Sequence, residues 1–418
     1  MRVVHLSTFE QAGGAARAAH GLHRALLAEG VASEMVVMER QSRDETVHVA
    51  ARDPIDARLE ALCGRFWSAG NRTPLTNTAF SIGFGACDAV THDAVGRADV
   101  INLHWVPQLL DARALGALRA LDKPVVWTLH DEWAYTGGCH YTAGCERFRE
   151  KCRACPQLAR DPHSLVELRF AQKRDACRDA RIAVAAPSQW LARRARESAV
   201  LRGSRVECIP YGVDTDVFHP SRRSEGRARL GASDDEFVLL FSAEAAFERR
   251  KGFAELKAAL EAARALLHAD AARLRLAVLG HAFGVELPEG SVTLGHVASR
   301  EELAAIVAAS DLYAMPSLED NLPNGVLEAL ACGTPCVGFD VGGVPDMLDG
   351  TPGCTVVPKG AVAALADSFV AAIRGMHAVR AHRGAIRADA ERRYAHAVQA
   401  RAYRGLYRDL LDEKEDRP

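Results

Sequence analysis

Two acidic residues eight positions apart, Asp320 and Glu328, lie in the segment SLEDNLPNGVLEALACGTP at residues 317–335. The segment predicts a strand end, a turn and a helix that stops at its Gly-Thr-Pro sequence. With Asp320 in the turn and Glu328 in the helix, both carboxylates could accept hydrogen bonds from sugar or ribose hydroxyls. The structural alternative is that Asp320 or Asn321 caps the helix and Glu328 is an exposed helix residue.

Three basic residues, Arg249, Arg250 and Lys251, precede a second helix that is predicted to begin near Gly252. A helix N-terminus carries about half a positive charge, so these cations are destabilising there unless an anion or a carboxylate lies between them. A diphosphate would supply that charge. The alternative is a solvated basic loop that Glu248 partly offsets.

A glycine pair, Gly13 and Gly14, follows the first apolar run, RVVHLS, and opens a helix. Such a pair allows either a tight turn with close helix packing or backbone contact with an anion, and the pair alone does not choose between them.

A four-cysteine cluster has the spacing C-x5-C-x6-C-x2-C and consists of Cys139, Cys145, Cys152 and Cys155, with His140 beside the first. Four thiolates can close a tetrahedral zinc site that rigidifies a loop without a core of its own. A structural zinc and free thiols are both open, with an iron–sulfur cluster or a disulfide as lesser alternatives. The odd total of eleven cysteines favours a reducing compartment.

The positions of these residues depend on short runs rich in Val, Ile and Leu that alternate with amphipathic stretches. Continuous apolar runs are typical of parallel strands that helices cover on both faces, so we expect an α/β protein with doubly wound sheets. Turn formers and charges interrupt the pattern near residue 215. We therefore predict an N-terminal domain at 1–215 with a cysteine-rich loop at 137–158, a second domain at 216–393, and a C-terminal helix at 394–418 that could cross back to the first domain.

Length and charge limit the classes of function. A chain of 418 residues with 48% hydrophobic residues can form two cores, and a net charge of −2 argues against nucleic acid as the main partner. The sequence contains neither an apolar run of 18 residues nor a signal-peptide pattern at its start, so we expect a cytoplasmic protein that binds a small ligand.

The order of several motifs resembles a known enzyme family. The motifs are GGAARAAH, TLHDEWAYTGGCHY, IPYGVDTDVF, RRKG, and EDNLPN followed by ACGTPCV and GGVPDML. Together they resemble the retaining nucleotide-sugar glycosyltransferases of family four, most closely the bacterial enzymes of exopolysaccharide or colanic-acid type. The resemblance implies the GT-B fold, in which two Rossmann-like domains face each other across a cleft.

The resemblance also implies a reaction. A sugar would pass from a UDP- or GDP-sugar to a hydroxyl of a saccharide or lipid-linked saccharide, with retention at the anomeric carbon and without a catalytic metal. His130, at the end of the strand before HDEW, would face the donor sugar, and Asp131 would orient its loop. The implied catalytic residues are His130, Asp320 and Glu328, and the implied donor-binding residues are Gly13, Gly14, Arg250, Lys251, Glu319, Asn321, Leu322 and Asn324.

Three positions depart from the family pattern. The family usually has Glu-x7-Glu, whereas Asp320 stands first here, with Glu319 adjacent as a substitute. Pro323 stands where the family often has glycine, and proline has no N–H to offer a donor. An arginine commonly lies five residues before the phosphate-binding lysine, but Ala246 holds that place, so Arg250 is the replacement candidate.

Three alternatives to a transferase are a nucleotide-sugar epimerase, a phosphorylase on the same architecture, and a non-catalytic, metal-stabilised binding protein of a polysaccharide assembly complex. Fold does not choose between them. A basic stretch at residues 165–183 is usually a solvated face, but it could also hold the enzyme peripherally at the inner face of the membrane.

Overall fold

The computed structural model describes all residues except 53, 56, 59–61, 63–70, 77, 84–87, 179–181, 246–247, 282–283, 285 and 416–418. The chain forms two compact units. The first contains Met1–Tyr211 and Gln399–Pro418, and the second contains Gly212–Val398. The boundaries expected after residues 215 and 393 lie within a few residues of these divisions.

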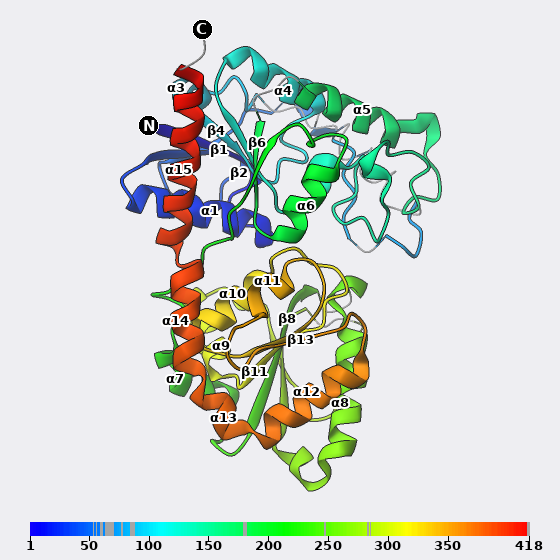
Figure 1. Ribbon diagram of the computed structural model, residues 1–418, viewed down its shortest axis with the longest axis vertical. Helices are drawn as coiled ribbons and strands as arrows, with labels where there is room; N and C mark the ends of the chain where they lie inside the picture. Colours follow the sequence, from blue (N-terminus) through cyan, green and yellow to red (C-terminus); the bar gives the residue numbers. More distant parts are fainter. Residues whose placement is uncertain are drawn as a thin grey trace. The chain divides into compact units, whose positions relative to one another are not determined.

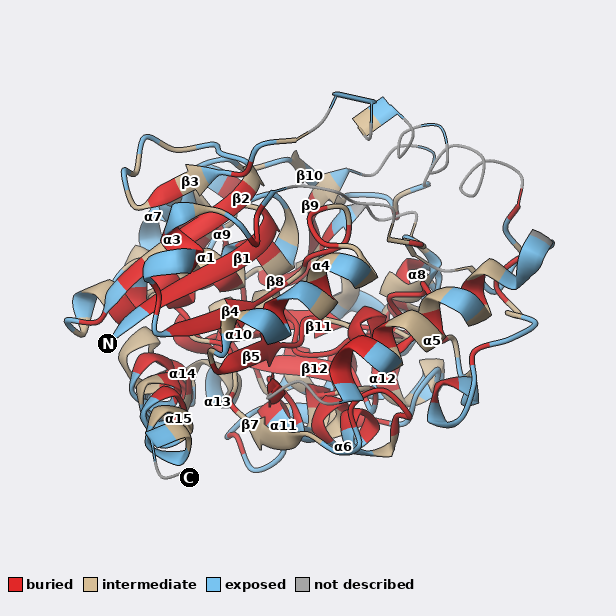
Figure 2. Cartoon of the chain, turned by 90° about the horizontal axis from the view of Figure 1, so that it is seen from above, coloured by how far each residue is buried: buried red, intermediate tan, exposed pale blue. Residues whose placement is uncertain are grey.

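The first unit contains a seven-stranded parallel sheet with the strand order β3-β2-β1-β4-β5-β6-β7 (Figure 1). Its central strands β4 and β5 are buried along their whole length, because helices cover both faces (Figure 2). The strands are β1 Arg2–Phe9, β2 Ala32–Glu39, β3 Val47–Val49, β4 Val100–Leu103, β5 Val125–Thr128, β6 Ile182–Ala186 and β7 Arg205–Cys208. The α-helices are α1 Gly13–Ala28, α3 Asp93–Arg97, α4 Ala112–Ala117, α5 Leu165–Arg178, α6 Gln189–Glu197 and, from the end of the chain, α15 His396–Glu415.

The second unit contains a six-stranded parallel sheet with the order β10-β9-β8-β11-β12-β13. Its strands are β8 Phe237–Ala245, β9 Leu274–His281, β10 Val292–Gly295, β11 Leu312–Met315, β12 Cys336–Phe339 and β13 Thr355–Val357. Its α-helices are α7 Arg223–Leu230, α8 Phe253–Leu267, α9 Arg300–Ala309, α10 Asn324–Ala331, α11 Val344–Leu348, α12 Val362–Arg374, α13 Met376–Ala381 and α14 Arg383–Tyr394. The expected α/β class with doubly wound parallel sheets is confirmed in both units.

Both strand orders reverse direction at one point, between β1 and β4 in the first sheet and between β8 and β11 in the second. Ligands of open α/β sheets bind beyond the carboxyl ends of the strands at such a switch point. Asp320 follows β11 and Lys251 follows β8, so both belong to the switch point of the second sheet. His104 follows β4 and His130 follows β5 in the first.

The C-terminal helix α15 is part of the first unit from Gln399 onward. Tyr403 and Tyr407 of α15 are fully buried in a core cluster with residues of α1 and of the first sheet. The Tyr407 hydroxyl accepts a hydrogen bond from Asn102 at 2.7 Å, and the Tyr403 hydroxyl lies 3.0 Å from the Thr128 hydroxyl. Among the residues that the structure describes, no helix combines the length and apolar character needed to span a membrane.

Candidate functional site

The switch point of the second sheet contains a cluster of one carboxylate and two cations. The Oδ2 atom of Asp320 lies 2.8 Å from the Lys251 ammonium and 3.3 Å from the Arg250 guanidinium. Arg250 also contacts the Glu248 carboxylate at 3.3 Å. The sequence analysis predicted that these cations are destabilising unless an anion or a carboxylate lies between them. In this structure the carboxylate of Asp320, which is 69 residues from Lys251, supplies that negative charge.

Backbone contacts hold the two loops of this cluster together. The N–H of Leu318 donates to the carbonyl of Arg250 at 2.7 Å. Gly252 has φ +71°, and a Cβ there would lie 1.7 Å from the carbonyl oxygen of Pro316. A Cβ on Gly342 would likewise lie 1.7 Å from the carbonyl oxygen of Asp320. These two positions therefore require glycine for the close approach of the loops.

Burial and charge act in opposite directions on Asp320. The side chain is 8% exposed, and burial alone would raise its pKa. The Lys251 and Arg250 cations, with the N–H of Asn321, outweigh burial and hold the pKa of Asp320 below its ordinary value. Asp320 is therefore an ionised carboxylate at neutral pH, beside two cations of which Lys251 is 19% exposed and Arg250 is 13% exposed.

Glu328 lies in the second turn of α10 and is partly buried. Burial raises the pKa of Tyr313 above its ordinary value, and the charges of Glu328 and Asp320 raise it further. Both carboxylates therefore lie within electrostatic reach of one phenol, that of Tyr313 in β11.

The capping alternative for the acidic segment is not what the structure shows. The residue before α10 is Pro323, and no side chain caps the helix. The other oxygen of Asp320 accepts from the N–H of Asn321 at 3.0 Å rather than from the helix. The first turn of α10 also contains no acidic residue, so its N-terminal N–H groups face no carboxylate of their own turn.

The other predicted donor-binding residues of the second unit lie in the same turn or at the start of α10. Asn321 and Leu322 are buried, and the carbonyl of Asn321 accepts from the N–H of Gly343 at 2.7 Å. Asn324 is the first residue of α10. The carbonyl of Glu319 lies 3.5 Å from the Arg250 guanidinium. Ala246, which holds the place of the family's arginine, is outside the described residues.

In the first unit, His130 is buried at the end of β5 with both ring nitrogens hydrogen-bonded. Its Nδ1 lies 2.8 Å from the Tyr211 hydroxyl, and its Nε2 lies 3.0 Å from Nδ1 of His104. Burial lowers the pKa of His130 to about 4, so the ring is neutral at pH 7. The sequence analysis did not select His104 or Tyr211, although the sequence NLHW at a strand end was a signal of the same kind as TLHD.

Asp131 is held by a different set of partners. It accepts from the Trp105 indole at 2.9 Å and from the N–H of Trp133 at 2.9 Å, and it lies 2.6 Å from Nδ1 of His140. Burial would raise the pKa of Asp131, but His140 and the N–H donors hold it below its ordinary value. The other nitrogen of His140 contacts the Ser81 hydroxyl at 2.9 Å, so His140 belongs to this network and not to the cysteine cluster.

Gly13 and Gly14 open α1 as expected. Gly13 has φ +83°, which suits a tight turn, but a Cβ there would have nothing within 4 Å, so close packing does not require glycine at this position. The helix has no side-chain cap and no acidic residue in its first turn.

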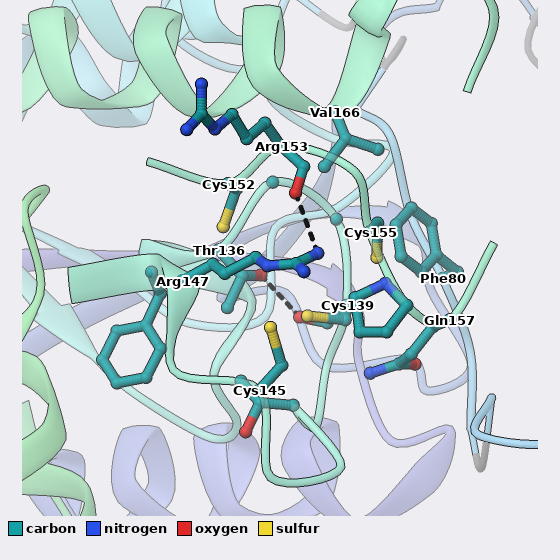
Figure 3. A pocket seen from close by; sticks show the side chains of 15 residues that line it. Phe80, Thr136, Cys139, Cys145, Arg147, Cys152, Arg153, Cys155, Gln157 and Val166 are labelled. Atoms are coloured by element: carbon teal, nitrogen blue, oxygen red, sulfur yellow. Dashed lines mark hydrogen bonds between the residues drawn. The ribbon is translucent and has the colours of Figure 1, made fainter. Parts of the chain in front are cut away.

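The four cysteines of the cluster line one pocket (Figure 3). None of the four forms a disulfide, and the guanidinium of Arg147 lies among them, where it donates to the carbonyls of Arg153 and Ala154. Burial raises the pKa of Cys152 to about 12. Within the described part of the chain no group of three or more His, Cys, Asp or Glu residues is arranged to hold a metal, so the zinc site stays a prediction.

The loop that carries the cysteines is fastened to α6 by a buried ion pair. Arg194 is paired with Glu132, and its guanidinium also donates to the Thr142 hydroxyl at 2.8 Å and contacts the Glu146 carboxylate at 3.0 Å. The N–H of Thr142 donates to Glu132 at 2.9 Å. This network holds the loop in place independently of any metal.

The basic stretch at 165–183 is only partly a solvated face. Arg174 and Arg178 are exposed, but Lys173 is 4% exposed, which corrects the expectation that it belonged to the charged surface. Its ammonium donates to the carbonyl of Trp133 and lies 3.9 Å from the centre of that indole, and burial lowers its pKa to about 8. Arg181 is outside the described residues.

Each unit has the Rossmann-type sheet, and the chain as a whole has the fold of the GT-B glycosyltransferases. Sucrose-phosphate synthase from Thermosynechococcus elongatus matches 99% of this chain and 100% of its own at a TM-score of 0.69 and 18% identity. Anabaena HepE in complex with UDP-glucose matches 98% of this chain and 100% of its own at 0.63 and 16% identity. The catalytic domain of starch synthase IV from Arabidopsis thaliana, bound to ADP and acarbose, matches 99% of both chains at 0.65 and 14% identity.

Family models agree with the fold. Residues 12–217 match the model described as Glycosyltransferase Family 4, and residues 236–374 match Glycosyl transferases group 1. The chain therefore carries a domain of each of these two glycosyltransferase families.

Curated relatives match over a shorter length. D-inositol 3-phosphate glycosyltransferase 1 of Catenulispora acidiphila is 37% identical over 158 residues, which are 34% of this chain and 36% of that protein. The D-inositol 3-phosphate glycosyltransferase of Mycobacterium bovis is 33% identical over 178 residues, or 39% of this chain and 35% of that protein. The match thus spans about a third of each relative.

Proposed function

We propose that the protein is a retaining glycosyltransferase that transfers a sugar from a nucleotide-diphosphate sugar to an acceptor hydroxyl in polysaccharide or glycolipid synthesis. The cluster of Lys251, Arg250 and Asp320 at the switch point of the second sheet is the observation that carries this proposal. The glycosyltransferase domains support it, as do the HepE complex with UDP-glucose and the starch synthase complex with ADP.

In this mechanism Lys251 and Arg250 bind the diphosphate. Negative charge gathers on the leaving diphosphate in the transition state, and a preorganised cation is worth more there than in the ground state. Asp320 fixes both cations in place before the donor arrives. Because the cations stabilise the leaving group, the reaction needs no divalent metal at this point.

The two carboxylates have different parts in donor recognition. Glu328, inside α10, accepts hydrogen bonds from the ribose hydroxyls, which are common to donor and product nucleotide. Asp320 shares its charge between the two cations and the hydroxyls of the transferred sugar. The N-terminal N–H groups of α10 and the segment Asn321, Leu322 and Asn324 complete the donor site, with Glu319 as the substitute first acid.

The proposed acceptor is a saccharide or a lipid-linked saccharide, and the proposed location is the cytoplasm, with peripheral contact at the inner face of the membrane. The exposed part of α5 would make that contact: Arg174 and Arg178 are 37% and 61% exposed, and Leu168 is 49% exposed. Cations beside an exposed apolar side chain suit an anionic lipid surface.

The test is a panel of UDP-, GDP- and ADP-sugars, with binding measured by calorimetry and transfer by mass spectrometry. We expect one donor class to bind to the wild type and to bind at least tenfold more weakly to Lys251→Ala, with Arg249→Ala as the control because Arg249 pairs with Glu255 instead. Activity should survive excess EDTA, and NMR of the product should show the anomeric configuration of the donor. Donor binding without any transfer would favour a binding protein, and inversion would refute the retaining mechanism.

A further inference from the structure

Three buried histidines form a continuous hydrogen-bonded chain across neighbouring strands of the first sheet. Nδ1 of His5, in β1, lies 2.9 Å from Nε2 of His104, and Nδ1 of His104 lies 3.0 Å from Nε2 of His130. Nδ1 of His130 then lies 2.8 Å from the hydroxyl of Tyr211. The four residues are between 0 and 9% exposed, so water does not complete these bonds.

The protons in this chain can be assigned from its end at Tyr211. A hydroxyl has one proton, and that of Tyr211 donates to the carbonyl of Leu129 at 3.2 Å. Tyr211 therefore accepts from His130, which places the proton of the neutral His130 ring on Nδ1. The Nε2 of His130 then accepts from Nδ1–H of His104, and Nε2 of His104 accepts from Nδ1–H of His5.

In the assignment above, the forward direction, each histidine donates from Nδ1. The reverse direction, in which each histidine donates from Nε2, is less favourable at both ends of the histidine chain. The hydrogen-bonded chain ends at Nε2 of His5, which is buried without a hydrogen-bond partner among the described residues. In the forward direction this atom is an unpaired lone pair, whereas in the reverse direction it is an unpaired N–H, the rarer state in protein interiors. The reverse direction would also take the Tyr211 proton away from the carbonyl of Leu129. A buried donor without an acceptor is costly enough to set the direction of the whole chain.

We propose that His104, supported by His5, holds His130 as a neutral imidazole with its proton on Nδ1, so that His130 is a hydrogen-bond donor and not a general base. This inference rests on the proposed function and on the expectation, implied by the family resemblance, that His130 faces the donor sugar. A sugar or diphosphate oxygen that replaces Tyr211 as the partner of Nδ1 must accept the proton. The lone pair of Nε2 is occupied by His104, so His130 cannot deprotonate the acceptor hydroxyl. His104 and His5 are positioning residues in this scheme.

The charged and titratable neighbours of the chain do not change this assignment. His23 of α1 packs edge-on against His5 with ring centres 5.9 Å apart, and its own nitrogens contact Ser33 and Thr46 at 2.8 and 2.9 Å. Asp131 acts on His130 through its charge but bonds to other side chains, as described above. Among the described residues, the charged and titratable groups that act on His23 are His20, Arg24, Asp44 and Glu10.

The first measurement needs no substrate. In wild-type protein labelled with ¹⁵N on histidine, long-range ¹H–¹⁵N spectra at pH 7 should show Nδ1 protonated and Nε2 unprotonated for His5, His104 and His130. His104→Leu removes the donor to Nε2 of His130, so Nε2 becomes an unpaired lone pair and its ¹⁵N resonance should shift, while Nδ1 stays protonated beside Tyr211. His5→Leu provides a second test two rings away, should His104→Leu fail to fold. His48→Leu is the control, because His48 pairs with Glu34 and is not part of the hydrogen-bonded chain of histidines.

The second measurement uses the transfer reaction. We expect His104→Leu to lower kcat by roughly 10- to 100-fold, as for a misplaced catalytic group, with little change in the KM of the donor. The activity of this variant should acquire an acid limb that the wild type lacks between pH 5 and 8, because Nε2 of His130 is then open to protonation. The control should show neither effect.

Three results would overturn the proposal: a wild-type His130 protonated on Nε2, unchanged spectra in both leucine variants, or an unchanged kcat in a folded His104→Leu protein. The spectra are independent of turnover. If the wild type transferred no sugar while the spectra were as expected, the proposed function would fail and the proton assignment would stand.

Discussion

Among the described residues, Asp320 provides the carboxylate that Lys251 contacts, and Arg250 contacts the carboxylates of Asp320 and Glu248. Asp320→Asn therefore removes the carboxylate partner of Lys251 and one of the two partners of Arg250. Loss of one partner of a buried ion pair costs about 3–5 kcal/mol, because the other charge stays behind. The side chain of Lys251 is 19% exposed and the asparagine carbonyl can still accept a hydrogen bond, so we expect the low end, about 3 kcal/mol. For a unit of this size, each kcal/mol lowers Tm by about 2–4 °C, which predicts a decrease of about 6–12 °C.

Scanning calorimetry measures this change in the transition of the second unit, with Asp340→Asn as the control. Asp340 is exposed at the end of β12, and its replacement should change stability by less than about 0.5 kcal/mol. Asp320 has a lowered pKa, so its contribution is present above the unfolded pKa of about 3.9 and is lost as the pH falls through the folded pKa. Wild type and variant should therefore converge in acid. An Asp320→Asn protein that melts with the control at pH 7 would refute the ion-pair reasoning.

Three further predictions concern other parts of the molecule. Gly252→Ala should destabilise the second unit by more than the roughly 1–2 kcal/mol of left-handed backbone strain, because the new Cβ would meet the Pro316 carbonyl. Gly360→Ala is the control, because Gly360 has φ +74° and open space at its Cβ position and should show the backbone strain alone. Equal melting temperatures for the two variants would contradict this prediction. The pKa of His130 is about 4 in the folded protein and about 6.5 in the unfolded chain, so between these pH values the folded state binds fewer protons. The free energy of unfolding should therefore fall by about 3 kcal/mol from this residue as the pH is lowered from 6.5 to 4. An unfolding free energy that stays constant over this range would contradict the prediction. If the four thiols form a metal site, elemental analysis of protein purified without chelator should find one zinc per chain. Cys152→Ser should lose the zinc, and the control Cys177→Ser should keep it. Wild-type protein without zinc would show that the four cysteines are free thiols.

The sequence predicted the fold class well because buried parallel strands have a local signature. Runs such as VVW and CVGF contain no charged or strongly polar residue, and no knowledge of their neighbours is needed to recognise them. The ion pair of Lys251 with Asp320 has no such signature, since 69 residues separate its members and only the strand order brings the two loops together. The roles of both residues in donor binding stay a prediction.

Side-chain direction was the other limit. Lys173 belongs to a run of basic residues on α5, and helix periodicity alone gives no sign that the Trp133 carbonyl and indole lie under it. The histidine chain was missed for a similar reason: His5, His104 and His130 each stand alone in the sequence. Their contact follows from alternate side chains of neighbouring strands projecting from one face of the sheet.

The return of α15 to the first unit has a consequence for the order of events during synthesis. Asn102 donates to the Tyr407 hydroxyl, Thr128 is hydrogen-bonded to the Tyr403 hydroxyl, and the core beside them includes Leu406. At about 5–20 residues per second, the ribosome needs roughly 10–40 s to make Gly212–Val398 after the strands of the first sheet have emerged. During that interval the N-terminal sheet exposes an apolar face on which Asn102 and Thr128 have each other but not their tyrosine partners. The second unit has no such delay, so the half of the chain made later can finish folding before the half made first.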